Sequence, residues 1–122
     1  MSKIDYKSAG VDIDAGNEAV DRIKDGVKST FTSNVLTGIG SFGSLYDLKP
    51  ILEKYNHPVM VQSIDGVGTK TIIARKLGKF DTIGIDLLSA AANDILVMGA
   101  RPLTFLDYIA NDKLNPDIIE EI

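Results

Sequence analysis

The segment QSIDGVGTKT, residues 62–71, combines residue types that bind phosphate. Gly66 and Gly68 let backbone amides approach an anion closely, and Lys70 adds a positive charge. The segment is not a Walker loop, G-x-x-x-x-G-K-[ST], because Thr69 stands directly before the lysine. A helix that begins after this segment would present its N-terminus, which also favours an anion. The composition therefore fits a phosphate-binding loop of another kind, or a strand-to-helix turn in which the glycines only turn the chain.

Asp65 is the residue of this segment that a phosphate alone would repel. It becomes favourable when Mg²⁺ lies between the two groups, because this cation binds carboxylate and phosphate oxygens together. Asp94 stands at the border of the apolar face of a later helix, where a carboxylate is costly unless it is paired or binds a metal. Two interpretations stay open. Asp65 and Asp94 form a two-carboxylate Mg²⁺ site, or Asp65 caps a strand-to-helix turn and Asp94 reaches solvent or a lysine.

A second glycine-rich stretch, TGIGSFG, matches the dinucleotide fingerprint G-x-G-x-x-G at Gly38, Gly40 and Gly43. That fingerprint needs a strand directly before it and a helix directly after it. Here a helical pattern and the polar segment STFTSN precede it. The context favours a flexible loop, or a phosphate-contacting loop of another architecture, over a dinucleotide site.

The elements that must position these loops alternate between helices and apolar strands. Val20, Ile23 and Val27 recur at helical spacing and predict a first helix that begins at an Asp14 cap and ends near Lys28. Asp12 points the same way as Asp14 if that piece is extended, so both are candidates for the cap or for the metal site. Further helices are expected within residues 45–55 (interrupted by a proline), over 71–77, over 86–98, and from 116 after an Asn-Pro start.

Strands are expected at residues 58–64 and 102–109, which are apolar and rich in β-branched or aromatic side chains. Residues 82–85 fit a short strand or an extended approach to the next helix. This alternation predicts an α/β or α+β fold, with a strand order that the pattern does not give.

Composition excludes several classes of protein. The chain has 122 residues, a net charge of −4 and no cysteine. An acidic balance argues against nucleic acid and anionic membranes as partners, and the lack of cysteine excludes disulfides and thiolate metal sites. No apolar run approaches the ~18–20 residues of a membrane span, and the N-terminus has no apolar signal core, so export is not expected.

Taken together, the motifs resemble one family. YKSAGVDIDAG, GIGSFGSL, DGVGTK and DTIGIDLLSAAANDILVMGA with RPLTFLDY occur in the order and spacing found in phosphoribosylformylglycinamidine cyclo-ligases, also called aminoimidazole ribonucleotide synthetases. The resemblance runs from Tyr6 to Leu114, and several motifs in register are far more specific than any one of them. The family's chains are much longer, which agrees with the short helical start at the end of this chain. Residues 1–122 are therefore expected to be the N-terminal third, an incomplete ATP-binding and dimerisation domain without the C-terminal domain.

The resemblance implies an ATP-dependent ligase of de novo purine biosynthesis. ATP activates the amide oxygen of formylglycinamidine ribonucleotide, an internal nitrogen closes the imidazole ring of aminoimidazole ribonucleotide, and ADP and phosphate leave. Such chemistry is mostly positioning and charge stabilisation, so no catalytic residue is assigned. The resemblance also implies a cytoplasmic homodimer and a mixed sheet with helices on one face, through which the subunits join.

The same resemblance implies the site residues. The ATP phosphates and Mg²⁺ would be held by Asp65, Gly66, Gly68, Thr69 and Lys70, with Asp94 as a metal ligand. A mobile loop over nucleotide or substrate would be formed by Gly40, Ser41, Phe42 and Gly43. Lys24 of the first helix would be a further nucleotide contact.

Other functions are compatible with parts of this pattern. Selenophosphate synthetase, thiamine-phosphate kinase and formylglycinamidine ribonucleotide synthetase belong to the same superfamily and use related aspartate-rich ATP sites. AGVDIDAG together with DGVGTK favours the cyclo-ligase, and the lack of an N-terminal cysteine argues against typical selenophosphate synthetases. The alternative of a different class is a non-catalytic dimerisation domain whose glycine loops are turns. In either case residues 1–122 alone are expected to be inactive, because the missing domain would supply substrate contacts.

Overall fold

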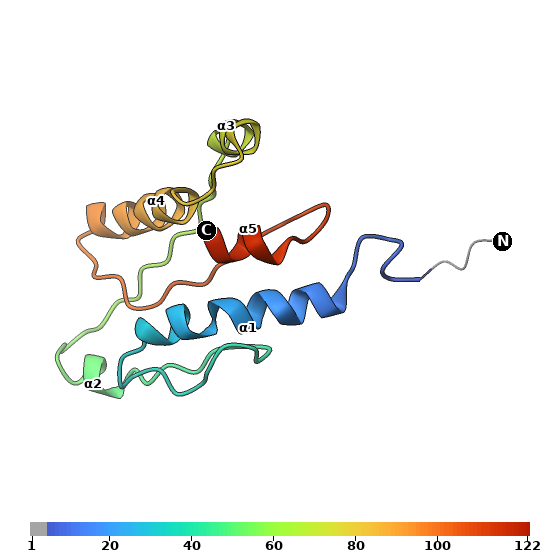
Figure 1. Ribbon diagram of the computed structural model, residues 1–122. Helices are drawn as coiled ribbons and strands as arrows, with labels where there is room; N and C mark the ends of the chain where they lie inside the picture. The colour runs from blue at the N-terminus through green and yellow to red at the C-terminus, as the bar shows by residue number, and fades with distance from the viewer. Residues whose placement is uncertain (1–4) are drawn as a thin grey trace. The chain divides into compact units, whose positions relative to one another are not determined.

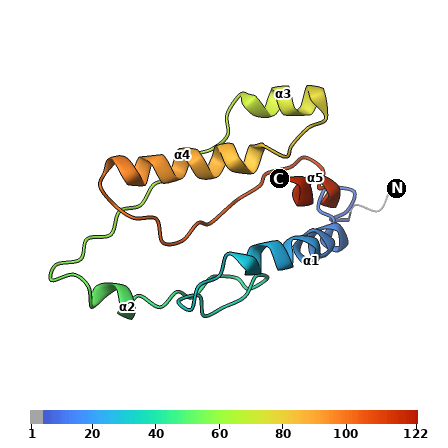
Figure 2. The ribbon, with the colours of Figure 1, turned by 60° about the vertical axis from the view of Figure 1, so that its left-hand side comes forward.

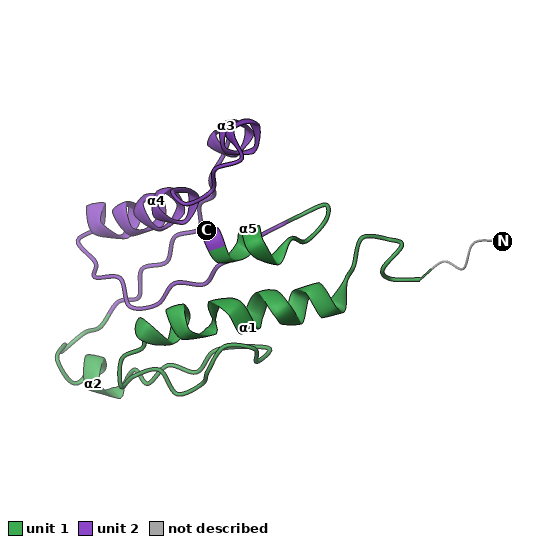
Figure 3. Ribbon diagram, in the orientation of Figure 1, with its two compact units in different colours: residues 1–58, 111–120 green, residues 59–110, 121–122 purple. Residues whose placement is uncertain are grey.

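A computed structural model describes residues 5–122, whose regular structure is helical. The helices are α1 (Ile13–Ser29), α2 (Lys49–Leu52), α3 (Lys70–Leu77), α4 (Ile83–Val97) and α5 (Pro116–Glu121), as labelled in Figure 1. The chain divides into two compact units, shown in Figure 3. Of the described residues, unit 1 comprises 5–58 and 111–120, and unit 2 comprises 59–110 and 121–122.

The expected mixed sheet is wrong for the part of the chain that is described. Between residues 5 and 122 the β-structure amounts to one isolated antiparallel bridge, Val35 to Tyr46. Residues 58–64 and 102–109 run as coil in both ribbon views (Figures 1 and 2), and apolar side chains along them stay exposed, among them Ile64 at 98% and Tyr108 at 90%. A β-branched pattern is a local signal, whereas a strand exists only when a partner strand accepts its backbone hydrogen bonds. Because residues 5–122 form no sheet, the expected dimerisation through a sheet has no structural basis in them.

In unit 1, helix α1 begins at a different cap from the one predicted. The N-cap is Asp12, whose Oδ1 accepts a hydrogen bond from the Ala15 amide at 3.2 Å, while Asp14 lies inside the first turn. Both residues favour a helix N-terminus, and the pattern could not choose between acids two positions apart. The C-terminal boundary at Ser29 agrees with the predicted end near Lys28.

The cap of α1 makes its start sensitive to acid. Lys7 Nζ lies 2.9 Å from Asp12 Oδ2, and this hydrogen bond, with that of the Ala15 amide, lowers the pKa of Asp12 below its ordinary 3.8. A lowered folded-state pKa means that the stabilisation is present above pH 3.8 and is lost as the pH falls through the lower folded value. We expect the Ala15 amide resonance to shift and its exchange protection to fall over that range. In Asp12→Asn, which caps without titrating, this acid transition should be absent; its persistence would assign the transition to another group.

Helix α5 follows the predicted start signals closely. Asn115 Oδ1 accepts a hydrogen bond from the Asp117 amide at 3.0 Å, and Pro116 occupies the first helical position. Arg22 of α1 ties this helix to unit 1, since its Nη1 lies 2.6 Å from Asp117 Oδ1 and 3.1 Å from Glu120 Oε2. Pairing with Glu18, then with these two carboxylates, raises the pKa of Arg22.

Three other helix boundaries in the chain test the sequence rules. Gly78 ends α3 with φ +61°, as predicted for a left-handed C-terminal glycine. Helix α4 begins at Ile83, about one turn before the predicted start, so residues 82–85 are not a strand. Pro50 lies in the first turn of α2 and does not interrupt it. Backbone amides of a first turn have no acceptor within the helix, so the amide that proline lacks is not needed there.

Gly84, in the first turn of α4, is needed for close backbone packing in unit 2. A Cβ at this position would overlap the carbonyl oxygen of Ile122, and the adjoining Glu121 Oε1 accepts a hydrogen bond from the Phe80 amide at 2.8 Å. Gly84→Ala should therefore displace residues 121–122 and speed hydrogen exchange at Phe80, although alanine is ordinarily favoured in a helix by about 1 kcal/mol. Gly26→Ala in α1 is the matched control, because nothing lies within 4 Å of its added Cβ. Unchanged exchange at Phe80 in Gly84→Ala would contradict this account.

Among the helices described, none combines the length and apolarity that crossing a membrane requires.

Candidate functional site

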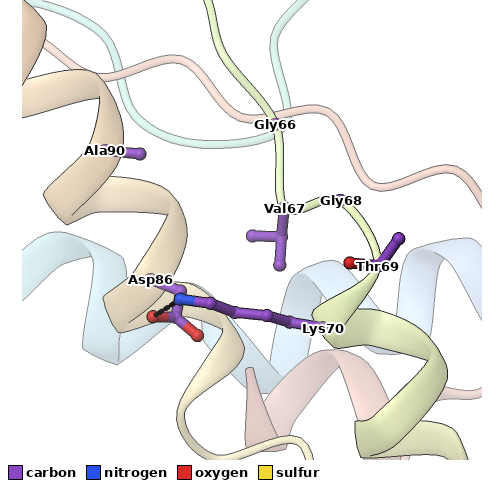
Figure 4. A pocket seen from close by; sticks show the side chains of 7 residues that line it. All are labelled: Gly66, Val67, Gly68, Thr69, Lys70, Asp86 and Ala90. Carbon is purple, nitrogen blue, oxygen red and sulfur yellow. Dashed lines mark hydrogen bonds and ion pairs between the residues drawn. The ribbon is translucent and has the colours of Figure 1, made fainter.

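The segment QSIDGVGTKT forms one wall of a pocket in unit 2. The pocket has a volume of about 220 Å³ and lies between this loop and α4. Its lining residues, drawn in Figure 4, are Gly66, Val67, Gly68, Thr69 and Lys70 from the loop and Asp86 and Ala90 from α4. Four of the residues predicted to hold the ATP phosphates thus line one cavity: both glycines, the threonine and the lysine.

Helix α3 begins at Lys70, so the loop does lead into a helix N-terminus, as predicted. The Thr69 side chain makes no capping hydrogen bond, whereas the Thr71 hydroxyl donates to the Gly68 carbonyl at 2.9 Å and tightens the turn. The start of α3 therefore meets the pocket without a side-chain cap over it. This is an arrangement in which backbone amides and the helix dipole favour an anion.

Lys70 reaches across the pocket to α4. Its Nζ donates a hydrogen bond to Asp86 Oδ1 at 2.7 Å, and Figure 4 shows the side chain extended from the start of α3 to this carboxylate. The Lys70 side chain is 65% exposed and that of Asp86 is 35% exposed. The positive charge predicted for this loop is thus held at the pocket by a partner that the sequence interpretation did not include.

Asp94 lies against the loop on its N-terminal side. The Ser63 hydroxyl donates a hydrogen bond to Asp94 Oδ2 at 2.8 Å, and Ser63 stands two residues before Asp65. Asp65 Oδ1 accepts a hydrogen bond from the amide of Gly66 at 2.7 Å, so its carboxylate also folds onto the loop. The structure therefore brings Asp94 to the segment that carries Asp65, through Ser63.

The predicted metal ligands, Asp65 and Asp94, supply two carboxylates. Within residues 5–122 no three or more side chains of His, Cys, Asp or Glu converge as a metal cage. Mg²⁺ does not need such a cage, because it commonly binds through one or two carboxylates, with waters and phosphate oxygens completing its octahedron. Asp94 contacts Ser63 and Asp65 contacts the Gly66 amide, neither carboxylate lines the pocket, and joint binding of Mg²⁺ by Asp65 and Asp94 stays a prediction.

Two carboxylates on one side of α4 contact the loop at its two ends. Asp86, Ala90 and Asp94 are four residues apart and therefore lie along the same side of the helix. Asp94 holds Ser63, and Asp86 holds Lys70, about 12 Å further along the axis by the helical rise. Residues 66–69, which lie between Ser63 and Lys70, line the pocket. Asp86 is a pocket-lining residue that sequence reasoning missed, and its spacing of eight from Asp94 was the available signal.

The second glycine-rich stretch belongs to unit 1 and is a closed loop. The Leu36 amide donates to the Leu45 carbonyl at 2.8 Å, and the Asp47 amide donates to the Asn34 carbonyl at 2.7 Å. These bonds close the base of a loop with residues 38–43 at its tip. The predicted loop is confirmed, and neither a strand before it nor a helix directly after it supports a dinucleotide fingerprint.

Side chains and glycines of that tip are open to solvent. Gly40 has φ +97°, a conformation that favours glycine, while Ser41, Phe42 and Gly43 are exposed. Lys24 of α1, in the same unit, is exposed, and its Nζ lies 4.0 Å from Asp21 Oδ1. The contact of these residues with a nucleotide stays a prediction.

Comparison with known proteins defines the class. Residues 51–122 match the family described as AIR synthase related protein, N-terminal domain. This match covers more than half of the chain, which therefore belongs to that family.

The chain is similar to proteins named phosphoribosylformylglycinamidine cyclo-ligase. It is 55% identical over 122 residues to the protein of Carboxydothermus hydrogenoformans, covering 100% of this chain and 35% of the relative. For Brevibacillus brevis the identity is 54% over 117 residues, covering 96% and 33%, and for Nitrosococcus oceani it is 51% over 121 residues, covering 99% and 33%. The chain thus spans between 33% and 35% of the length of these relatives.

Proposed function

We propose that the protein to which this chain belongs is an ATP-dependent cyclo-ligase that converts formylglycinamidine ribonucleotide to aminoimidazole ribonucleotide, ADP and phosphate in purine biosynthesis. The observation that carries the proposal is the 55% identity to a protein of that name over all 122 residues, which includes the pocket-forming loop and the side of α4 that contacts it. The pocket adds a physical argument, because three features that favour an anion meet there. They are the Lys70 ammonium, the glycine backbone and the uncapped N-terminus of α3.

In this proposal the chain's own residues bind and orient the phosphates of ATP. The glycine backbone at residues 66–68 approaches the phosphate oxygens, and Lys70 offsets their negative charge. Asp65 and Asp94 would hold Mg²⁺, which when bound neutralises phosphate charge. A fixed arrangement of this kind accelerates phosphoryl transfer by positioning and by electrostatic stabilisation, without a protein nucleophile.

The size of the pocket limits what it binds. About 220 Å³ is smaller than the ~300–1,000 Å³ of a typical small-molecule pocket, so it suits a phosphate group and not a whole nucleotide. We keep the loop tip at residues 40–43 and Lys24, which are exposed groups of unit 1, as proposed nucleotide contacts.

The test is turnover by the full-length protein. With formylglycinamidine ribonucleotide, ATP and Mg²⁺, we expect ADP and aminoimidazole ribonucleotide to appear in equal amounts. Thiamine phosphate and selenide serve as competing substrates. ATP consumption with either of these, or no ADP release with formylglycinamidine ribonucleotide, would contradict the proposal. Residues 1–122 alone are expected to give no turnover, because they span between 33% and 35% of the relatives' length.

A further inference from the structure

The ion pair between Lys70 and Asp86 is a feature of the pocket that the proposed function does not use. We infer that Asp86 is a positioning residue, which holds the Lys70 ammonium at the pocket so that it meets a phosphate group in a fixed orientation. The inference rests on the proposed function for the identity of the ligand, ATP. It adds a specific role to a residue of α4 that neither the loop motif nor the metal-site hypothesis includes.

A lysine at this position needs a partner to be an effective phosphate ligand. Its ammonium is carried on a flexible four-carbon stem, and here the side chain is 65% exposed, so little packing restrains it. The Nζ–Oδ1 distance of 2.7 Å is that of a charge-assisted hydrogen bond. One of the three N–H donors is used by Asp86, and two remain for a phosphate.

Helix α4 makes Asp86 a suitable anchor. It is a 15-residue helix, and Asp86 lies in its first turn, one turn from Ala90, whose small side chain also lines the pocket. The charges of Asp86 and Lys70 sum to zero, so the carboxylate does not leave the pocket with a net negative charge. The ion pair contributes orientation. Because Asp86 already orders the Lys70 side chain, less side-chain entropy is lost when phosphate binds.

The experiment measures Mg·ATP binding to the full-length protein by calorimetry, in a double-mutant cycle. Asp86→Ala should weaken binding about tenfold, which corresponds to about 1.4 kcal/mol, with Asp86→Asn intermediate because it keeps a hydrogen-bond acceptor. In a Lys70→Met background, Asp86→Ala should have no further effect, since Asp86 acts through the lysine. Asp81→Ala is the matched control, because Asp81 pairs with Lys79 at 3.7 Å in the same unit and lies outside the pocket lining. It should bind as the wild type does.

The outcomes separate this inference from the proposed function. A wild-type protein that does not bind Mg·ATP overturns both. A wild type that binds, with Asp86→Ala binding equally or more tightly, overturns the inference alone and would mean that Asp86 competes with phosphate for the lysine. An equal loss in the wild-type and Lys70→Met backgrounds would show a structural role for Asp86 and also overturns it. Asp86→Asn provides the same comparison if Asp86→Ala lowers the thermal midpoint.

Discussion

Replacing Asp65 and Asp94 together by asparagine is expected to remove the gain in ATP affinity that Mg²⁺ gives the full-length protein. Asparagine keeps the size of each side chain and the hydrogen bonds that these positions accept from Gly66 and Ser63, but it removes both negative charges. Mg²⁺ binds proteins through such carboxylates, so the affinity for Mg·ATP should fall by a hundredfold or more, equal to about 2.7 kcal/mol. Calorimetry with and without Mg²⁺ measures this loss.

The design separates metal binding from phosphate binding. ATP without Mg²⁺ still meets Lys70 and the glycine backbone, so its weaker affinity should not fall in the double variant. Asp25→Asn serves as the charge control, because Asp25 is an exposed carboxylate of α1 in the other unit. If the double variant keeps the wild-type dependence on Mg²⁺, Asp65 and Asp94 are not the metal ligands, and their contacts with Gly66 and Ser63 are their whole role.

Much of this site follows from sequence because the loop is a local feature. Glycine spacing, Lys70 and the helix start are read within ten residues, and the structure confirms that they share one pocket. Asp86 was not predicted because its partner is 16 residues away; its spacing of eight from Asp94 indicates a shared side of the helix but not the ion pair with Lys70. Asp65 and Asp94 lie between these cases. The sequence marks both as unusual carboxylates, while only the fold shows that Asp94 reaches the loop through Ser63.

The same distinction explains the fold. Helices α1, α3, α4 and α5 were predicted with the right type because their hydrogen bonds, caps and C-terminal glycines are made within a few residues. The sheet prediction was wrong because a strand depends on a partner that no local pattern supplies, and residues 58–64 and 102–109 have no strand pairing in the described chain. The displaced cap at Asp12 is the smaller error, a choice between two suitable acids.

Replacing Ile119 by alanine is expected to cause the largest loss of stability in unit 1. Ile119 is 8% exposed, and within the described residues the other buried hydrophobic side chains are the small ones of Ala19 and Ala74. Helix α5 has six residues, too few to be stable without tertiary contacts, so burial of this side chain must hold it in place. Truncating a buried isoleucine to alanine costs about 2–5 kcal/mol. Urea unfolding of the full-length protein, followed by circular dichroism, measures the change.

Ile118→Ala is the matched control, since Ile118 is the same residue type on the same helix but is only partly buried. In Ile118→Ala the free energy of unfolding should fall by less than half of the loss in Ile119→Ala, because the substitution removes less buried apolar area. Arg22→Met separates burial from charge: it removes the ion pairs to Asp117 and Glu120 while keeping an unbranched stem, and exposed pairs of this kind contribute little each. Equal losses in Ile118→Ala and Ile119→Ala, or a larger loss in Arg22→Met, would mean that surface charge and not the buried isoleucine holds α5 in unit 1.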